Sequence, residues 1–243
     1  PLVAIVFSGV QADLPRLITA PVFLRAAATS LGIAAFSAIF VIIVSMAIIR
    51  ARQAVSAKRR AARPLHLLSS VLGAGSSLVL LVPPVVLGSG WFLLLRPFGD
   101  VAVYAPVLVA LINMLMALPL AMRVLEPAVT SHFLRTGRLS ASLGLQGLPR
   151  LRFADLPVLW RPLAMAFSFA MALSLGDLGA VALFGSENFV TLPWLVYSNM
   201  GSYRTNDAAG YAFLLGVVCL LLAATGVSRH SQPEQAKAAE AMT

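Results

Sequence analysis

The 243 residues are 59% hydrophobic and only 11% charged, with a mean hydropathy of +0.89. Soluble domains carry about 25% charged residues, so this chain has too little charge to cover a water-facing surface. The net charge of +9 comes from basic residues in short segments between apolar stretches, a pattern that orients membrane proteins and argues against nucleic-acid binding. The single cysteine, Cys219, excludes a disulfide within the chain and a metal site built on cysteine pairs.

Five stretches are long and apolar enough to cross a bilayer, which takes about 20 residues at about 1.5 Å of rise each. They cover residues 26–49, 67–95, 101–122, 163–184 and 208–227. The apolar run from Pro1 to Phe7 has no charged segment before it, so we interpret it as the end of a preceding helix and not as a signal peptide. The sequence therefore predicts an all-α polytopic transmembrane helix bundle over residues 1–227. We expect the polar tail, 228–243, to be frayed or disordered.

The distribution of basic residues predicts how this bundle is oriented. If all five stretches cross the membrane, the segments 50–63 and 123–161 and the C-terminal tail fall on one side, with fourteen of the eighteen Lys and Arg residues. The other side carries four, namely Arg16, Arg25, Arg96 and Arg204. The positive-inside rule places the basic side, with the C-terminus, in the cytoplasm.

The second stretch contains helix-breaking residues. Pro83 and Pro84 lie in its middle, and Gly88 to Gly90 follow one turn later. Proline removes a backbone donor and clashes with the preceding turn, and broken helices at membrane depth survive where they are buried in protein or line a cavity. A kink beside a transport path and an ordinary packing kink both remain open.

The segment between the third and fourth stretches, 123–161, is too long for a simple connector. Leucines recur in it at helical spacings beside polar residues, with Gly144 and Gly147 to Pro149 as interruptions. The pattern fits a short amphipathic helix across the cytoplasmic mouth. Such a helix either docks into a groove of a partner or rests on lipid.

One spacing in this segment resembles a known family. Gly144 is followed at the tenth position by Ala154, and then by Leu156 and Pro157. This order is similar to the cytoplasmic loop of bacterial ABC-importer permeases, whose pattern is Glu-Ala-Ala, three residues, Gly, nine residues and Ile-x-Leu-Pro. The Gly and Leu-Pro positions match, whereas the Glu position holds Arg138 and the Ile position holds Ala154. The resemblance implies an ATPase-coupling loop of Arg138, Leu139, Ser140, Ala141, Ser142, Leu143, Gly144, Leu145, Leu156 and Pro157.

Further segments extend the resemblance over about residues 20–226. Residues 81–95, 174–185, 191–193 and 201–204 resemble the C-terminal half of the membrane subunit of thiamine importers, a family in which two homologous halves share one polypeptide. Sister permeases for ferric iron, sulfate, molybdate and polyamines carry a segment similar to 174–185. The resemblance points to a translocation path or gate that includes Pro83, Pro84, Gly88, Gly176, Asp177 and Gly179.

Asp177 is the one acid well inside an apolar stretch. A carboxylate in hydrocarbon costs several kcal/mol, so this side chain should face protein or water. It is either a polar group on the path of a cationic substrate or a packing acid flanked by Gly176 and Gly179 for close helix approach. The polar segment 185–207 is expected to form an outer loop, either a docking surface for a binding protein or a solvated loop.

The sequence predicts no catalytic residues and no metal site. It contains no G-x-S-x-G, no H-E-x-x-H and no phosphate-binding loop, and His66, His132 and His230 have no ligand spacing. The chain itself is expected to bind no cofactor, so the resemblance implies that ATP and Mg act through a separate cytoplasmic ATP-binding subunit. It also implies a periplasmic substrate-binding protein, the other permease half in the same polypeptide and the lipid bilayer as partners.

We therefore expect a membrane-spanning permease half that moves thiamine, or a phosphorylated form, across the bacterial inner membrane by alternating access. A ferric-iron or a sulfate or molybdate permease is the alternative within the family. An ion-coupled secondary transporter or channel is the alternative from another class, and it would require ionisable relays across several spans. Asp177 alone does not make such a relay.

Overall fold

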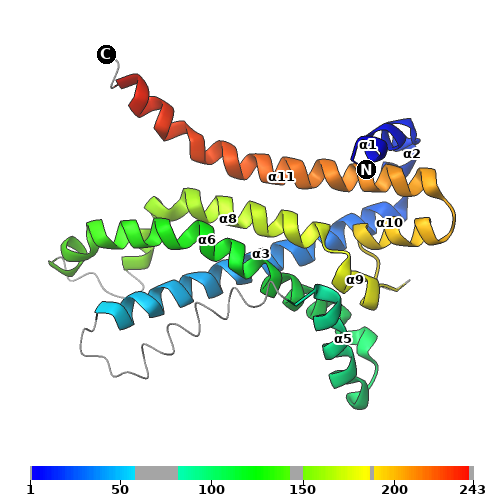
Figure 1. Ribbon diagram of the computed structural model, residues 1–243, viewed down its shortest axis with the longest axis horizontal. Coiled ribbons are helices and arrows are strands. Elements are labelled where there is room, and N and C mark those ends of the chain that lie inside the picture. The colour runs from blue at the N-terminus through cyan, green and yellow to red at the C-terminus, as the bar shows by residue number, and fades with distance from the viewer. Residues whose placement is uncertain (1, 58–81, 143–149, 187–188, 241–243) are drawn as a thin grey trace.

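The computed structural model describes residues 2–57, 82–142, 150–186 and 189–240, and every regular element in these ranges is a helix (Figure 1). In chain order the α-helices are α1 (Leu2–Gln11), α2 (Leu14–Thr19), α3 (Pro21–Ala57), α5 (Pro84–Leu95), α6 (Ala105–Ser142), α8 (Leu156–Gly176), α9 (Gly179–Phe184), α10 (Leu192–Gly201) and α11 (Thr205–Glu240). Two 3₁₀ turns, Arg96–Phe98 and Val101–Tyr104, precede α6, and a π-helical turn, Leu151–Asp155, leads into α8.

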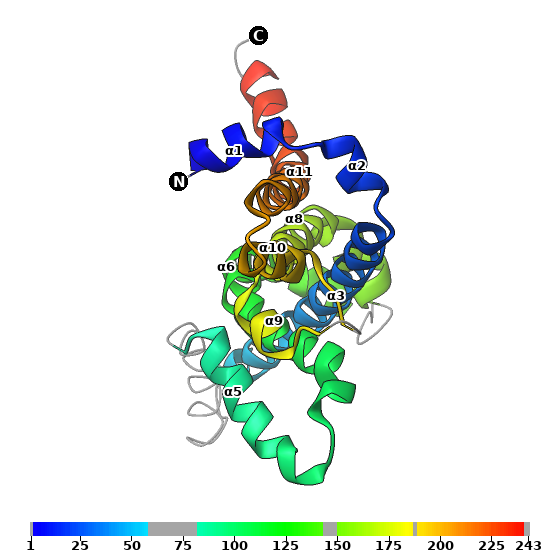
Figure 2. The ribbon, with the colours of Figure 1, turned by 90° about the vertical axis from the view of Figure 1, so that its right-hand side faces the viewer.

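Helices α3, α6 and α8 form the core of the bundle, and each packs against the other two. α11 lies along α8, while α5 leaves the bundle at an angle and contacts α9 (Figures 1 and 2). Alanines occupy many core positions, which lets helix backbones approach closely where lipid gives no hydrophobic drive for association. These alanines are Ala34, Ala38, Ala117, Ala121, Ala166 and Ala170.

Polar contacts fix the helices relative to one another. In the core, the buried Ser37 hydroxyl donates to the Ala110 carbonyl at 3.0 Å and so joins α3 to α6. At one end of the bundle, Arg16 of α2 pairs with Asp207 in the first turn of α11. That position also favours a carboxylate, because the amino end of a helix carries partial positive charge.

Four helical stretches of the described chain are long and apolar enough to cross a membrane: Pro21–Gln53, Val101–Thr136, Leu151–Gly176 and Thr205–Gly226. They overlap the first, third, fourth and fifth stretches that the sequence predicts, and the all-α polytopic architecture is confirmed. The fourth stretch was predicted to end at Phe184, but its long helix ends at Gly176. Residues 67–81 of the second predicted stretch lie outside the described residues. Its remaining part contributes the shorter apolar helix α5.

The predicted boundaries of the long connecting segment are wrong. The sequence placed a loop from Arg123 to Arg161, but α6 continues to Ser142 and helical structure resumes at Arg150. The 38 residues of α6 correspond to about 57 Å of helix, far more than the bilayer core of about 30 Å. The extension is helical because Leu125 and Val129 continue the buried core face beyond the apolar window.

Three further expectations need correction. The tail expected to be frayed is helical through Glu240 as a continuation of α11. The polar segment 185–207 is not simply a loop, since it contains α10, whose first turn is capped by the Thr191 hydroxyl accepting from the Trp194 N–H at 3.4 Å. Gly88 to Gly90 do not break the second stretch, because they lie inside α5 and the helix begins only after Pro83.

The alanine core yields a test of packing. We expect Ala38→Leu to lower the melting temperature of the detergent-purified protein, because Ala38 is fully buried and overpacking a core costs about 1–3 kcal/mol. Ala47→Leu is the matched control, since Ala47 is an exposed alanine of the same helix. Equal melting temperatures for the two variants would contradict the α3 contacts described here.

Candidate functional site

The residues that the sequence singles out for a path or gate converge in space. Pro84 opens α5 and Gly179 opens α9, and these two helices are in contact. A Cβ atom added at Gly179 would lie 3.1 Å from the Cβ of Pro84 and 3.3 Å from a methyl group of Val85. Gly88 faces the other end of α9, where an added Cβ would lie 2.7 Å from a methyl group of Leu183. Glycine at these positions lets α5 and α9 lie against each other.

The fourth predicted stretch is not one continuous helix. α8 ends at Gly176, Asp177 has an extended backbone with ψ of 104°, and α9 starts at Gly179. Asp177 Oδ1 accepts the Gly179 N–H at 2.8 Å, so the carboxylate satisfies a donor that the break leaves free. Interrupted helices at membrane depth need such a partner or a cavity.

A cavity of about 530 Å³ opens beside this break. Its lining is mostly apolar and comes from the start of α5, the middle of α6 and the end of α8. The lining residues are Pro84, Asn113, Met116, Pro119, Leu120, Arg123, Ala172, Leu173, Ser174, Gly176 and Asp177. Three of the six predicted path residues, Pro84, Gly176 and Asp177, thus share one cavity.

Asn113 is the buried polar side chain of α6 at this cavity. Its amide nitrogen donates to the Ser174 hydroxyl at 2.7 Å and lies 3.3 Å from the Ser174 carbonyl oxygen. These bonds join the middle of α6 to the last turns of α8. Asn113 Oδ1 and Asp177 Oδ2 are both buried and have no hydrogen-bond partner within the described part of the chain.

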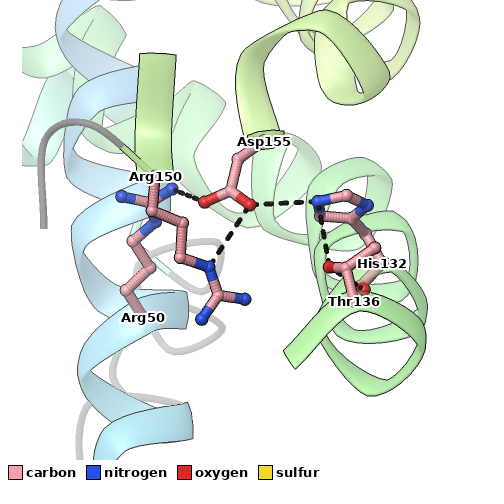
Figure 3. Close-up of polar contacts among 5 residues, drawn as sticks. All are labelled: Arg50, His132, Thr136, Arg150 and Asp155. Carbon is pink, nitrogen blue, oxygen red and sulfur yellow. Dashed lines mark hydrogen bonds and ion pairs between the residues drawn. The ribbon is translucent and has the colours of Figure 1, made fainter. Parts of the chain in front are cut away.

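A second polar cluster lies at the opposite end of α8 (Figure 3). Its centre is the buried Asp155, the last residue of the π-helical turn. Asp155 Oδ2 lies 2.6 Å from Arg50 Nη2 on α3, and Oδ1 lies 3.0 Å from His132 Nε2 on α6. Arg150 Nε approaches Oδ1 at 3.6 Å, an ion pair too long for a hydrogen bond. One carboxylate therefore joins all three core helices.

The other members of this cluster hold their positions through neighbouring groups. The Thr136 hydroxyl donates to the His132 carbonyl at 2.8 Å and lies 3.4 Å from His132 Nε2. The Arg150 guanidinium lies over the Phe133 ring at 4.8 Å from its centroid, a cation–π arrangement. The two arginines, the histidine and the carboxylate form a site that carries excess positive charge.

Comparison with known proteins decides the family. No protein-family model matches the chain. It is 47% identical over 222 residues to the thiamine transport system permease protein ThiP of Brucella abortus (strain 2308), a match that covers 91% of this chain and 39% of that protein. It is 39% identical to the protein of the same name from Escherichia coli (strain K12), over 91% of this chain and 40% of that protein. The chain belongs to this permease family.

A third relative agrees with this result. The ThiP protein of Haemophilus influenzae (strain ATCC 51907 / DSM 11121 / KW20 / Rd) is 37% identical over 63% of this chain and 28% of its own length. The chain spans about two fifths of the length of the first two permeases. With its four apolar helical stretches among the described residues, it is a multi-pass membrane protein, and its relatives are transport subunits.

The residues that the resemblance predicts for an ATPase-coupling loop fall in three places. Arg138 to Ser142 form the last turn of α6. Leu143, Gly144 and Leu145 lie outside the described residues. Leu156 and Pro157 open α8 and are exposed. The structure thus places both described parts at one end of the permease, and Asp155 directly precedes the second of them.

The sequence did not reveal the Asp155 cluster or Asn113. Arg50 and Asp155 are 105 residues apart and Asn113 and Ser174 are 61 apart, so no local motif joins them. The sequence did contain one signal that pointed to the Asp155 cluster. Glu126 and Asp155 are the only acids among six arginines in the segment 123–161, and Glu126 also finds an arginine, with Arg52 Nη1 at 2.7 Å.

The contribution of the Asp155 cluster to the stability of the helix bundle can be tested. We expect Asp155→Ala to destabilise the purified protein by about 3 kcal/mol, because removing one partner of a buried pair leaves the remaining charges uncompensated. The measurement is the thermal midpoint in detergent, followed by size-exclusion chromatography. Glu126→Ala is the control, since the Arg52–Glu126 pair is partly exposed and such pairs contribute at most about 1 kcal/mol. Equal shifts for both variants would argue against a buried joint at Asp155.

Proposed function

We propose that this chain is the translocating part of the membrane subunit of an ATP-driven thiamine importer in the bacterial inner membrane. The observation that carries the proposal is the 47% identity over 91% of the chain with a thiamine transport system permease. The interrupted helix at Asp177 and the cavity beside it support the proposal. Discontinuous helices line the substrate sites of many secondary transporters.

The partners follow from the same relationship. ATP and Mg bind to a separate cytoplasmic ATPase subunit, and a periplasmic binding protein delivers the substrate to the outer end of the bundle. Exposed apolar side chains at the start of α8, those of Phe153, Leu156 and Trp160, support docking of a protein partner there. The remaining part of the permease polypeptide completes the path. The positive-inside rule supports a cytoplasmic position for this end and for the C-terminus.

The geometry of α8 supports alternating access as the transport mechanism. Its 21 residues make a rod of about 30 Å, with the Asp155 cluster at one end and the Asp177 break at the other. A displacement of the coupling residues by the ATPase moves the start of α8 together with α3 and α6. The far end of the rod is joined through Asp177 to α9, which contacts α5 where Gly179 meets Pro84, so its motion is passed on to these two helices.

A ferric-iron or a sulfate or molybdate importer is the second candidate, because sister permeases resemble the Asp177 segment. An ion-coupled transporter or channel is less well supported. Among the described residues of the apolar stretches, Asp177 is the one acid beside the cavity, whereas proton and ion relays use several ionisable groups.

Reconstitution tests the substrate directly. The complete permease, its ATPase and its binding protein are placed in proteoliposomes, and uptake of radiolabelled thiamine is measured with and without ATP. We expect uptake that requires ATP and the binding protein. ATP-dependent uptake of ferric iron or sulfate without thiamine uptake would replace thiamine by the second candidate.

Plugging the cavity tests the path. Gly176 lines the cavity, and a Cβ added there meets no atom within 4 Å among the described residues, so the first side-chain atom of Gly176→Phe is accommodated at the cavity wall. We expect it to lower thiamine uptake by at least about tenfold, or about 1.4 kcal/mol, with little change in melting temperature. Gly90→Phe is the control, because an added Cβ there is also unobstructed and Gly90 does not line the cavity. Full uptake by Gly176→Phe would exclude this cavity from the path.

A further inference from the structure

Two oxygen atoms in the cavity beside Asp177 lack hydrogen-bond donors among the described residues. They are Asn113 Oδ1 and Asp177 Oδ2, and both are buried. The great majority of buried side-chain polar atoms have a partner. An unsatisfied one destabilises the folded state, and more so if it is charged. A ligand with hydrogen-bond donors could satisfy two such acceptors on residues that line one cavity.

Both side chains are held in place by their other polar atom. Asp177 Oδ1 accepts the Gly179 N–H, and the Asn113 amide nitrogen donates to Ser174. The nitrogen serves both Ser174 acceptors in this orientation, whereas after an exchange Oδ1 could accept only from the Ser174 hydroxyl and would face the Ser174 carbonyl oxygen 3.3 Å away, an acceptor against an acceptor. The free oxygens are therefore pre-positioned, and helix capping uses only one oxygen of the Asp177 carboxylate.

The cavity does not neutralise this carboxylate. Arg123 also lines it, but Arg123 lies ten residues beyond Asn113 on α6, about 15 Å along the helix axis. No ion pair joins Arg123 to Asp177 in the described chain. Met116, Leu120 and Leu173 supply apolar walls, and a charge in such surroundings attracts an opposite charge far more strongly than in water.

We propose that Asn113 and Asp177 form a transient binding site for an organic cation that carries N–H donors. The volume of about 530 Å³ lies within the range of small-molecule sites. The Asn113 oxygen accepts an amino group of the ligand, and the Asp177 carboxylate balances its positive charge. Thiamine has both groups, an amino-pyrimidine and a quaternary thiazolium, so the assignment of thiamine to this site rests on the proposed function. The charge selectivity of the site does not rest on the proposed function.

The charge selectivity is tested without any transported substrate. Met116→Cys is introduced into the complete permease with all other cysteines replaced, including Cys219→Ser. The rate of modification is measured with a trimethylammonium-ethyl and a sulfonatoethyl methanethiosulfonate reagent. The ratio of the two rates is divided by the same ratio for a small free thiol in solution, and we expect this normalised preference for the cationic reagent to be about tenfold. Asp177→Asn should abolish this preference while it keeps the Gly179 bond, and Asn113→Asp should increase it.

Asp207→Asn is the matched control for the labelling experiment. Asp207 lies outside the cavity and pairs with Arg16, so its charge should not affect the rate ratio at Met116→Cys. An unchanged ratio in Asp177→Asn would overturn the proposal and leave Asp177 as a helix cap only. A ratio that falls equally in Asp207→Asn would also overturn it, because the effect would then be a general one of net charge.

Uptake kinetics test thiamine at this site. In proteoliposomes, Asp177→Asn and Asn113→Leu should each lower kcat/KM for thiamine by at least about tenfold. Asp177→Asn should affect an uncharged analogue, with thiophene in place of the thiazolium, less than about threefold. Ser45→Ala is the control, since Ser45 carries another buried oxygen without a partner in the described chain, on α3 and outside the cavity.

The outcomes separate the two proposals. Wild-type protein that imports no thiamine but retains the cationic labelling preference would reject thiamine as substrate and support the cation site. Wild-type protein that imports thiamine, with unchanged kinetics in Asp177→Asn and Asn113→Leu, would support the proposed function and overturn the site. Equal losses for thiamine and the uncharged analogue would also overturn it, because charge recognition would be absent.

Discussion

A helix that stops inside apolar surroundings must find partners for the backbone groups it frees, and the Asp177 carboxylate supplies one at the end of α8. Its bond to the Gly179 N–H lets the chain turn and start α9 without water. The turn then brings Gly179 against Pro84, so α5 rests on α9 and closes one side of the cavity. With a continuous helix at this point, neither the contact nor the cavity would exist. Asp177, whose charge is costly in an apolar stretch, therefore stabilises the helix break and the α5–α9 contact that depends on it.

The carboxylates at the two ends of α8 differ in how far their charge is compensated by neighbouring groups. At one end, Asp155 is surrounded by Arg50, His132 and Arg150, and its charge is compensated within the protein. At the other end, Asp177 has a backbone donor on one oxygen and no partner on the other in the described residues. A compensated charge fixes helices relative to one another, whereas an uncompensated one is available to a ligand. Helix α8 thus connects the Asp155 cluster, which joins three helices, to the cation site proposed at Asp177.

The sequence predicted the elements that depend on composition and missed those that depend on distant contacts. The spans corresponding to α3, α6 and α11 follow from apolar runs, since lipid demands about 20 apolar residues. The extension of α6 to Ser142 was missed because packing of Leu125 and Val129, and not lipid, sustains it. Pro84, Gly176 and Asp177, which line the cavity, were singled out through the family resemblance, together with residue types typical of broken helices and of charge in an apolar stretch. Asn113 was missed because a single polar residue in an apolar run gives no local signal, and its hydrogen-bond partner Ser174 is 61 residues away.

This dependence on distant contacts bears on how related permeases distinguish substrates. Sister permeases for anions resemble the Asp177 segment, so an acid at the helix break cannot by itself select a cation. The capping oxygen serves the fold and is needed whatever the substrate. Selectivity must then come from the groups that surround the second oxygen. Here the cavity that Asp177 lines has apolar walls and Asn113 on α6, and Arg123, which also lines it, makes no ion pair with Asp177 in the described chain. A basic side chain in place of Asn113 would pair with the same carboxylate and leave the break intact, while it removed the attraction for a cation.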